Sequence, residues 1–341
     1  MSSPKLHFGL GLRARDPSIL QPYARDAEAS GFDHVWVYDS PRFAEPYVAM
    51  SYCAMATKKV TVGTAVTNPQ TREPAVIANG FATLSTLTGG RVAMGMGLGD
   101  SAVKFIGKQP ARFEEFREKI TIIRRLLAGE EIEYNGKPLR LPVPPKIKPP
   151  VLIAAEGPKT FEFAGAGCDG AIISPGGSPH FLKYAIENIR AGAVKAGRDP
   201  KSLHICAWTH CVVAPTRKQA MEELLPQVSR TFFKAAVRVP HQVLGFDKPL
   251  LSDQVREEAL RDVGRQDMEY KLAEKLHSII GDDLMREITV VGTPDEIPEK
   301  VRQLASVDGV SQLIVNIHAK DPKLTFDTFR DRIIPEFGIR T

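Results

Sequence analysis

Short apolar runs rich in β-branched residues alternate with amphipathic stretches along most of this chain. Such alternation is typical of parallel strands that are connected by helices. We interpret the following runs as strands: 5–12, 33–38, 59–67, 91–97, 151–155, 170–174, 203–214 and 311–318. Spacings of three and four between apolar residues predict helices at 17–30, 46–57, 74–87, 112–128, 159–165, 179–196, 294–305 and 326–337. Thr293 is the expected N-cap of the helix that begins at Pro294.

Two stretches interrupt this alternation. Residues 129–150 are rich in Pro, Lys and Gly and contain Tyr134-Asn135-Gly136-Lys137, a hairpin-type turn signal, so we expect a surface connection there. Residues 216–286 have a mixed helical pattern without a convincing strand, which predicts a helical insertion after the seventh strand that could act as a lid. Eight strand-plus-helix units favour an α/β fold, a closed (β/α)8 TIM barrel with 1–341 as one domain, over an open doubly wound sheet.

Composition narrows the class of protein. With 341 residues, 43% hydrophobic and 25% charged, the chain can bury a sizeable core, which excludes disordered and fibrous classes. A net charge of +5 from 45 basic and 40 acidic residues gives no concentrated field for a nucleic-acid backbone. The start of the chain has no signal-peptide pattern, and no apolar run approaches the roughly 18 residues of a membrane span. We therefore expect a soluble protein without nucleic-acid or membrane partners.

The chain contains four cysteines, and their spacing is irregular. They form neither a disulfide framework nor a Cys-x-x-Cys metal pair, so we expect a reducing cytoplasm and no metal site. The four are Cys53, Cys168, Cys206 and Cys211.

In a barrel, the loops that follow the strands meet at one mouth, and reactive residues are expected there. Asp39-Ser40 follows the second predicted strand, and Thr67-Asn68 follows the third. Glycine-containing loops follow the next three, at 97–101, 156–159 and 174–177. Glycine allows a planar ring to approach the main chain, and free amides beside helix starts can hold a phosphate. The alternative is that these glycines only turn the chain.

Several motifs occur in the order in which they occur in one enzyme family. They are residues 62–76, which read VGTAVTNPQTREPAV, then Leu87-Thr88-Gly89-Gly90-Arg91, the glycine run to Gly99-Asp100, and residues 153–159, which read IAAEGPK. With these motifs the chain resembles the luciferase-like flavin and deazaflavin oxidoreductases, and within them the coenzyme F420-dependent methylenetetrahydromethanopterin reductases. The resemblance covers about residues 6–200 and 292–316. It implies a barrel of the bacterial luciferase type that binds coenzyme F420 or, alternatively, FMN.

The resemblance also implies roles for individual residues near the cofactor. A non-proline cis peptide between Ala65 and Val66 would back the ring. The other residues expected to bind the cofactor are Asp39, Thr67, Asn68, Leu98 and Gly99 beside the ring, and Ala155, Glu156, Gly157, Ser174, Gly176 and Gly177 at its side chain or phosphate.

Two residues are candidates for catalysis. Asp100 matches a segment that supplies an acid near the reacting carbon in relatives, so it is the first candidate for a proton donor; the alternative is a helix cap before Ser101. Ser40 stands where sugar-phosphate-oxidising relatives have a histidine base, and Gly11 stands where the reductases have an acid. The substrate of neither group of relatives can therefore be transferred to this chain.

Three functions follow as hypotheses. The leading one is an F420-dependent oxidoreductase that transfers hydride to or from a small organic substrate. The alternative is a monooxygenase that receives reduced FMN from a partner flavin reductase. The third is a barrel that binds a cofactor without catalysis. Because relatives form dimers, the resemblance also implies a homodimer.

Overall fold

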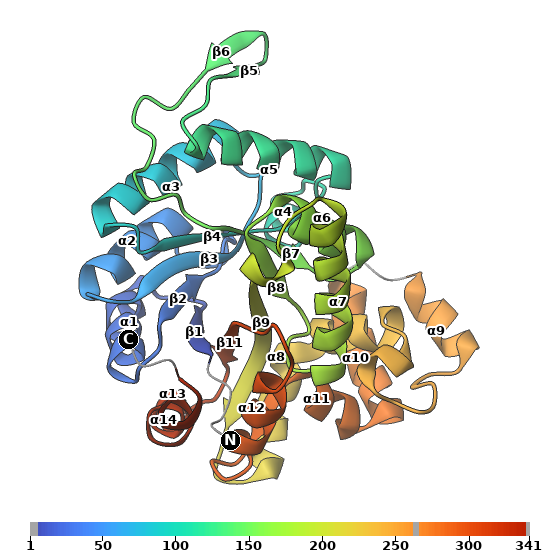
Figure 1. Ribbon diagram of the computed structural model, residues 1–341. Coiled ribbons are helices and arrows are strands. Elements are labelled where there is room, and N and C mark those ends of the chain that lie inside the picture. Colours follow the sequence, from blue (N-terminus) through green and yellow to red (C-terminus); the bar gives the residue numbers. More distant parts are fainter. Residues whose placement is uncertain (1–5, 262–265, 339–341) are drawn as a thin grey trace. The chain divides into compact units, whose positions relative to one another are not determined.

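The computed structural model describes residues 6–261 and 266–338, which form two compact units (Figure 1). The first unit comprises Gly9–Ile172 and Asn188–His204. The second comprises Met1–Phe8, Ile173–Glu187 and Ile205–Thr341, as far as these are described.

The first unit is built on a sheet in which the strand order is β1-β2-β3-β4-β7-β8. The pairs from β1 to β7 are parallel, as the alternation of strands and helices predicted. Its strands are β1 (His7–Leu12), β2 (His34–Val37), β3 (Thr61–Thr67), β4 (Val92–Met96), β7 (Val151–Ala155) and β8 (Gly170–Ile173). The register of β3 against β4 shifts between Thr64 and Thr67, so a bulge lies at the end of β3.

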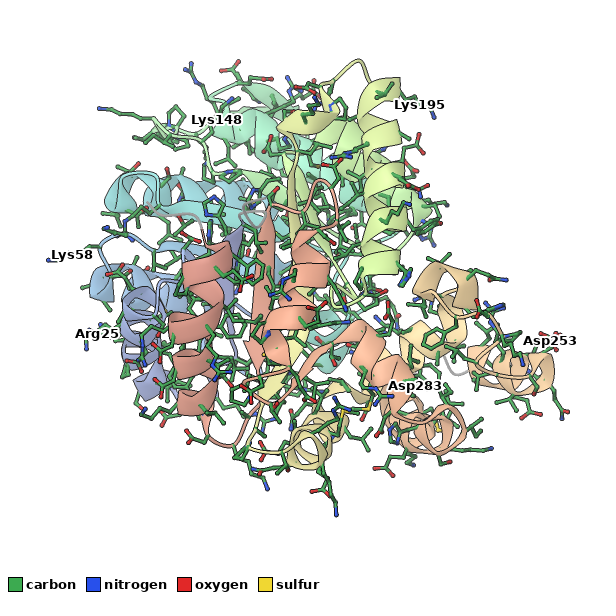
Figure 2. The ribbon with its side chains drawn as sticks, turned by 60° about the horizontal axis from the view of Figure 1, so that its bottom comes forward. Arg25, Lys58, Lys148, Lys195, Asp253 and Asp283 are labelled. Atoms are coloured by element: carbon green, nitrogen blue, oxygen red, sulfur yellow. The ribbon has the colours of Figure 1, made fainter. Side chains whose placement is uncertain are left out.

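Helices and one hairpin complete the first unit. Proline at the first helical position begins α2, α3 and α6, where a missing backbone N–H costs nothing. These elements are η1 (Pro17–Ile19), α1 (Leu20–Ala29), α2 (Pro46–Ala56), α3 (Pro74–Thr88), α4 (Ser101–Phe105), α5 (Phe113–Leu127), the antiparallel pair β5 (Ile132–Tyr134) and β6 (Lys137–Leu139), α6 (Pro158–Gly167), α7 (Pro179–Lys195), which continues from the second unit, and η2 (Pro200–Ser202). Charged side chains such as Arg25 and Lys58 project away from this unit into solvent (Figure 2).

The second unit contains a smaller parallel sheet with the order β10-β9-β11. Helix α8 packs against α10, α11 and β10. The elements are β9 (His204–Val213), α8 (Arg217–Arg238), η3 (His241–Leu244), α9 (Asp253–Leu260), α10 (Gln266–Ile280), α11 (Asp282–Ile288), β10 (Val290–Gly292), α12 (Ile297–Ala305), β11 (Gln312–Ile317), α13 (Pro322–Thr328), η4 (Phe329–Ile333) and α14 (Ile334–Phe337).

Apolar residues at helical spacing form the core of each unit. Phe116, Ile120 and Ile123 of α5 are fully buried, so the apolar face of this helix points into the interior of its unit. In the second unit Phe232 and Phe233 of α8 are likewise buried. All four cysteines are buried and unpaired. Among the described residues, no helix is both long and apolar enough to cross a membrane.

The eight predicted strands are all present, and each described end lies within two residues of its prediction. The hairpin turn predicted at Tyr134 to Lys137 joins β5 to β6, and Asn135 and Gly136 both adopt the positive φ that such a turn needs. The sequence did not predict β10, which is three residues long, and it implied α4, which is five residues long, only through the alternative of a helix cap at Asp100. Too few residues are present in either element to establish a period.

Two predicted helix starts were wrong. Helix α12 begins at Ile297 and not at Pro294, because the Glu296 carboxylate accepts the backbone N–H of Thr293 at 3.0 Å and closes a turn before the helix. The last helical region begins at Pro322, earlier than predicted, because Asp321 caps it by accepting the N–H of Lys323 at 2.9 Å.

Candidate active site

Four of the predicted site segments lie along one edge of the sheet in the first unit. Strands β2, β3, β4 and β7 are parallel neighbours, and Asp39-Ser40, Thr67-Asn68, residues 98–100 and residues 155–157 stand at their C-terminal ends. Neighbouring strands are about 4.8 Å apart, so residues at adjacent strand ends can contact one another. This edge of the first unit is the candidate active site.

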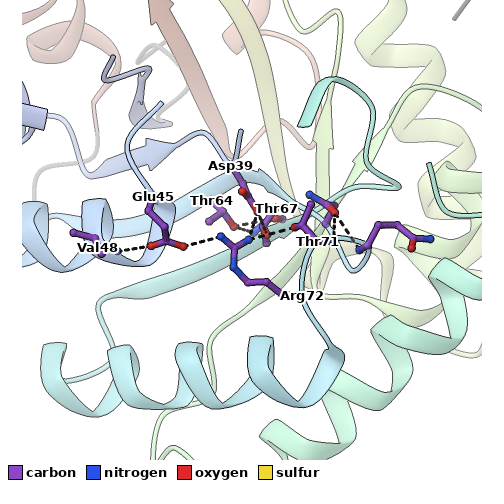
Figure 3. A network of polar contacts seen from close by, with 10 residues as sticks. Asp39, Glu45, Val48, Thr64, Thr67, Thr71 and Arg72 are labelled. Carbon is purple, nitrogen blue, oxygen red and sulfur yellow. Dashed lines mark hydrogen bonds and ion pairs between the residues drawn. The ribbon is translucent and has the colours of Figure 1, made fainter. Parts of the chain in front are cut away.

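Asp39 is the most strongly held residue at this edge. Its side chain is 5% exposed, and its Oδ2 accepts hydrogen bonds from Thr67 Oγ1 at 2.5 Å and from Arg72 Nη1 at 2.7 Å (Figure 3). Its Oδ1 makes no hydrogen bond among residues 6–261 and 266–338. One carboxylate oxygen is thus anchored, and the other is available to a ligand.

The bulge of β3 lies directly beside this carboxylate. The Ala65–Val66 peptide is cis, as the resemblance implied. Thr64 Oγ1 donates to the carbonyl of Gly95 at 2.9 Å and accepts its N–H at 3.2 Å, which ties β3 to β4. A Cβ at Gly95 would stand 2.1 Å from the Thr64 carbonyl oxygen, so this glycine is required by the close approach of the two strands.

Asn68 follows the bulge and shapes the next turn. Its Oδ1 accepts the backbone N–H groups of Gln70 and Thr71, both at 3.0 Å, which is an Asx-type turn. Its Nδ2 donates no hydrogen bond within the described part of the chain. Asn68 therefore orders the loop before Arg72 and still has an amide donor to offer.

At the end of β4, Gly99 turns the chain with a φ of 85°, and Leu98 is half-buried. Asp100 stands at the N-cap position of α4, but its side chain makes no capping hydrogen bond, so the helix-cap alternative is wrong. The carboxylate instead pairs with Lys104 Nζ at 2.8 Å, one helical turn later. The role of proton donor predicted for Asp100 stays a prediction.

Ser40 is 6% exposed, and its Oγ accepts the N–H of Arg42 at 3.5 Å, the limit of a hydrogen bond. The hydroxyl is therefore held only weakly.

The start of α6 is more open. The backbone N–H groups of Glu156 and Gly157 both point at Thr160 Oγ1 at 3.3 Å, which is a long hydrogen bond. A Cβ placed on Gly157 would meet nothing within 4 Å. Buried Ala155 precedes this turn at the end of β7. Two weakly engaged amides beside open space are suited to an anionic group.

The remaining predicted segment belongs to the second unit, where its glycines have a packing reason. The N–H of Gly176 donates to the Trp208 carbonyl of β9 at 2.7 Å. A Cβ on Gly177 would stand 2.3 Å from the backbone carbonyl carbon of Ile288. Ser174 precedes Pro175 through a cis peptide. The phosphate contact predicted for Ser174, Gly176 and Gly177 stays a prediction.

A polar cluster that the sequence did not predict follows these glycines. Ser178 Oγ donates to Glu287 Oε1 at 2.6 Å, and His180 Nδ1 lies 3.1 Å from the same oxygen. Lys300 Nζ donates to the Glu287 backbone carbonyl at 2.8 Å. Burial lowers the pKa of Lys300 to about 8, against the opposing effect of the Glu287 carboxylate.

The sequence did not show which side chains hold Asp39. Arg72 Nη2 donates to Glu45 Oε1 at 2.6 Å, and its guanidinium lies 5.1 Å from the centre of the Tyr47 ring. Arg72 falls inside the motif at 62–76, which was the one available signal, whereas Glu45 and Tyr47 lie in no motif. Within the described residues, no group of three His, Cys, Asp or Glu side chains is placed to hold a metal ion.

Comparison with known proteins identifies the class. Residues 7–311 match the model of the family described as luciferase-like monooxygenase. The chain therefore belongs to the luciferase-like monooxygenase family, as its motifs indicated.

Particular relatives are oxidoreductases. A 5,10-methylenetetrahydromethanopterin reductase from Methanolobus tindarius is 30% identical to this chain. The alignment covers 90% of this chain and 93% of that relative. An F420-dependent glucose-6-phosphate dehydrogenase from Nakamurella multipartita is 26% identical to this chain, and the alignment covers 98% of this chain and 97% of that relative. The solved coenzyme F420-dependent tetrahydromethanopterin reductase from Methanopyrus kandleri superposes with a TM-score of 0.76 at 23% identity, covering 98% of this chain and 99% of that one. This likeness shows the fold, which is the luciferase-type (β/α)8 barrel.

Proposed function

We propose that this protein is a coenzyme F420-dependent oxidoreductase that transfers a hydride to or from a small organic substrate. The observation that carries the proposal is the anchored Asp39 carboxylate at the end of β2, with Oδ1 available, in a chain 30% identical to a methylenetetrahydromethanopterin reductase. A deazaflavin ring carries N–H and hydroxyl donors that a buried carboxylate can orient. The bound cofactor supplies the two-electron chemistry, and the protein supplies position and electrostatics.

The residues at this edge of the first unit fit such a cofactor. Asp39 Oδ1 is an acceptor for the ring, and Asn68 Nδ2 is a donor for one of its carbonyl oxygens. The open turn at Glu156 and Gly157 would receive the phosphate-bearing side chain. Asp100, which pairs with Lys104 at 2.8 Å, would donate a proton to the substrate during reduction and accept it back during oxidation.

The proposal is tested by paired fluorescence titrations with coenzyme F420 and with FMN at matched ionic strength. Micromolar or tighter binding of F420, weakened in Asp39→Asn but not in the surface variant Arg25→Ala, is the expected result. Single-turnover oxidation of reduced F420 by a panel of carbonyls, imines and activated alkenes would then find the substrate class. Failure to bind F420 would overturn the proposal.

The second candidate is a monooxygenase that uses reduced FMN from a flavin reductase, which the description of the matching family favours. It predicts tighter binding of FMN than of F420 and oxygen consumption coupled to reduced FMN. Binding of either cofactor without turnover of any substrate would instead favour the third hypothesis, a barrel that binds a cofactor without catalysis.

We also propose that the protein forms a homodimer through α2. Most of this helix is apolar, and its buried face contacts the first unit. Val48, Tyr52 and Met55, spaced by four and three residues, form a second apolar face that is 54%, 51% and 81% exposed. An apolar face of this kind on a helix marks an interaction surface, and a second copy would present the same face to it.

The dimer is tested by the mass in solution. Met55→Lys combined with Tyr52→Glu should halve the mass measured by light scattering. Val194→Lys, which alters an isolated exposed apolar residue on α7, should not. A wild-type protein that is monomeric at micromolar concentration would refute the proposal.

Two further expectations remain proposals. A cytoplasmic location is supported by the four cysteines, all of which are buried and unpaired. A lid role for residues 216–286 is supported by the need of a reduced cofactor for exclusion of water. It predicts that cofactor binding slows proteolytic cleavage within this segment.

A further inference from the structure

Arg72 joins two carboxylates that come from different parts of the first unit. Its Nη1 donates to Asp39 Oδ2 at 2.7 Å, and its Nη2 donates to Glu45 Oε1 at 2.6 Å (Figure 3). The three side chains are 22%, 5% and 47% exposed for Arg72, Asp39 and Glu45. The guanidinium therefore connects a buried carboxylate to one at the surface.

The position of the guanidinium is itself determined from several sides. Glu45 uses its other oxygen, Oε2, to accept the N–H of Val48 at 3.0 Å, which caps α2 and limits the freedom of that carboxylate. The ring of Tyr47 lies under the guanidinium and packs edge-on against Phe81, with ring centroids 5.6 Å apart. Asn68 orders the turn that leads to Arg72.

The charge of Arg72 is secure in this setting. Partial burial tends to lower the pKa of the guanidinium, but Asp39 and Glu45, together with Tyr47, hold it above its usual value. Arg72 is thus a cation at neutral pH.

The consequence for Asp39 is an asymmetric carboxylate. Thr67 and Arg72 both donate to Oδ2, and neither donates to Oδ1. Two donors on one oxygen hold the carboxylate plane in one orientation, and the second oxygen keeps its lone pairs for a ligand.

We propose that Arg72, held by Glu45, is a positioning residue that orients Asp39 so that Oδ1 meets the cofactor. This inference rests on the proposed function, because it requires Asp39 to bind the cofactor. Arg72 itself acts through Asp39 and does not need to touch the cofactor or the substrate.

The alternative is an ion pair that only stabilises the fold, and a double-mutant cycle on cofactor affinity separates the two. Asp39→Asn should weaken F420 binding by at least about tenfold, the effect of losing a hydrogen bond to a charged group. Arg72→Ala should weaken it similarly. Arg72→Ala introduced into Asp39→Asn should cost less than about twofold further, because the residue through which Arg72 acts is already altered. A purely structural ion pair would lower the melting temperature in Arg72→Ala and leave the dissociation constant of the folded protein unchanged.

Three further measurements extend the test to a conservative variant and to chemical rescue. Arg72→Lys keeps the charge but can reach only one of the two carboxylates, so its affinity should fall between those of wild type and Arg72→Ala. Millimolar guanidinium should restore binding to Arg72→Ala, and urea, a neutral molecule of similar shape, should not. A crystal structure of Arg72→Lys should show the Asp39 carboxylate rotated.

The outcomes separate the positioning role of Arg72 from the proposed F420-dependent function. F420 binding that is weakened by Asp39→Asn but unaffected by either Arg72 variant would overturn the positioning role and leave the proposed function standing. Arg25→Ala serves as the matched control, because Arg25 projects from α1 and, within the described part of the chain, its side chain donates a hydrogen bond only to Gln21. A wild-type protein that does not bind F420 would overturn both.

Discussion

Two partly buried clusters in this molecule each contain a hydroxyl that donates to a carboxylate, and they differ in the cation beside that carboxylate. In the first unit, Thr67 donates a hydroxyl hydrogen bond to the carboxylate of Asp39, and in the second, Ser178 does the same to Glu287. The cation beside Asp39 is Arg72, which contacts the carboxylate directly. The cation near Glu287 is Lys300, which binds its backbone carbonyl and has a pKa lowered to about 8 by burial. The cation of the first cluster thus keeps its charge, whereas Lys300 in the second loses its proton as the pH rises through about 8.

The largest expected effect comes from removing the cation of the first cluster. Arg72→Ala would leave the Asp39 carboxylate, which is 5% exposed, without its cation. Loss of one partner from a buried pair costs several kcal/mol, and because Arg72 is partly exposed we expect about 3 kcal/mol in the free energy of unfolding, measured with urea. Glu45→Gln removes a charge that is half exposed and should cost less than about 1 kcal/mol. Equal losses in the two variants would show that Asp39 does not depend on Arg72.

Two glycine-to-alanine variants compare the backbone packing beside the second cluster with that at the start of α6. Gly177→Ala would drive a Cβ into the backbone at Ile288 and should cost about 2 kcal/mol, the usual effect of overpacking. Gly157→Ala, in the first unit, enters open space at an extended backbone and should leave stability unchanged. If a cofactor phosphate binds at the start of α6, Gly157→Ala should nevertheless weaken F420 binding. Similar unfolding curves for the two variants would contradict the packing role of Gly177.

The smallest effect is a pH dependence that comes from Lys300. Because its pKa is about 8 in the folded protein and 10.5 in the unfolded chain, the unfolded state binds more protons as the pH rises through 8. The contribution of this group to stability therefore increases with pH, by about 1 kcal/mol between pH 7 and pH 9. Lys300→Met should abolish this rise, and Arg72→Ala should not. Urea unfolding of the three proteins at both pH values measures the difference, and a slope retained in Lys300→Met would refute the assignment.

Much of the fold was predictable because periodicity is a local property. Strand β7 was predicted to the residue, since an apolar run bounded by Pro150 and Glu156 leaves little choice. The three residues of β10 could not be predicted, because their strand character comes from pairing with Cys211, Val212 and Val213, far away in the sequence.

The candidate site also contains residues that the sequence could predict and contacts that it could not. Asp39 and Thr67 were predictable as residues at strand ends, and the structure joins them by a hydrogen bond of 2.5 Å. The contact between Glu45 and Arg72 spans 27 residues and depends on where α2 begins, so no local pattern predicts it. Gly177 was predicted as a phosphate contact, but its packing against Ile288 involves a residue more than 100 positions later. Local patterns identify candidates, and long-range contacts decide how those candidates are used.

The burial of every cysteine makes the protein convenient to label. Burial raises the pKa of the Cys53 and Cys168 thiols to about 12 and that of the Cys206 and Cys211 thiols further, so the reactive thiolate is scarce at neutral pH. A cysteine introduced in place of the exposed Val48 would be the single site to react rapidly with a maleimide. A spin label attached there would report directly on the distance between the α2 helices of two copies, without removal of any native thiol.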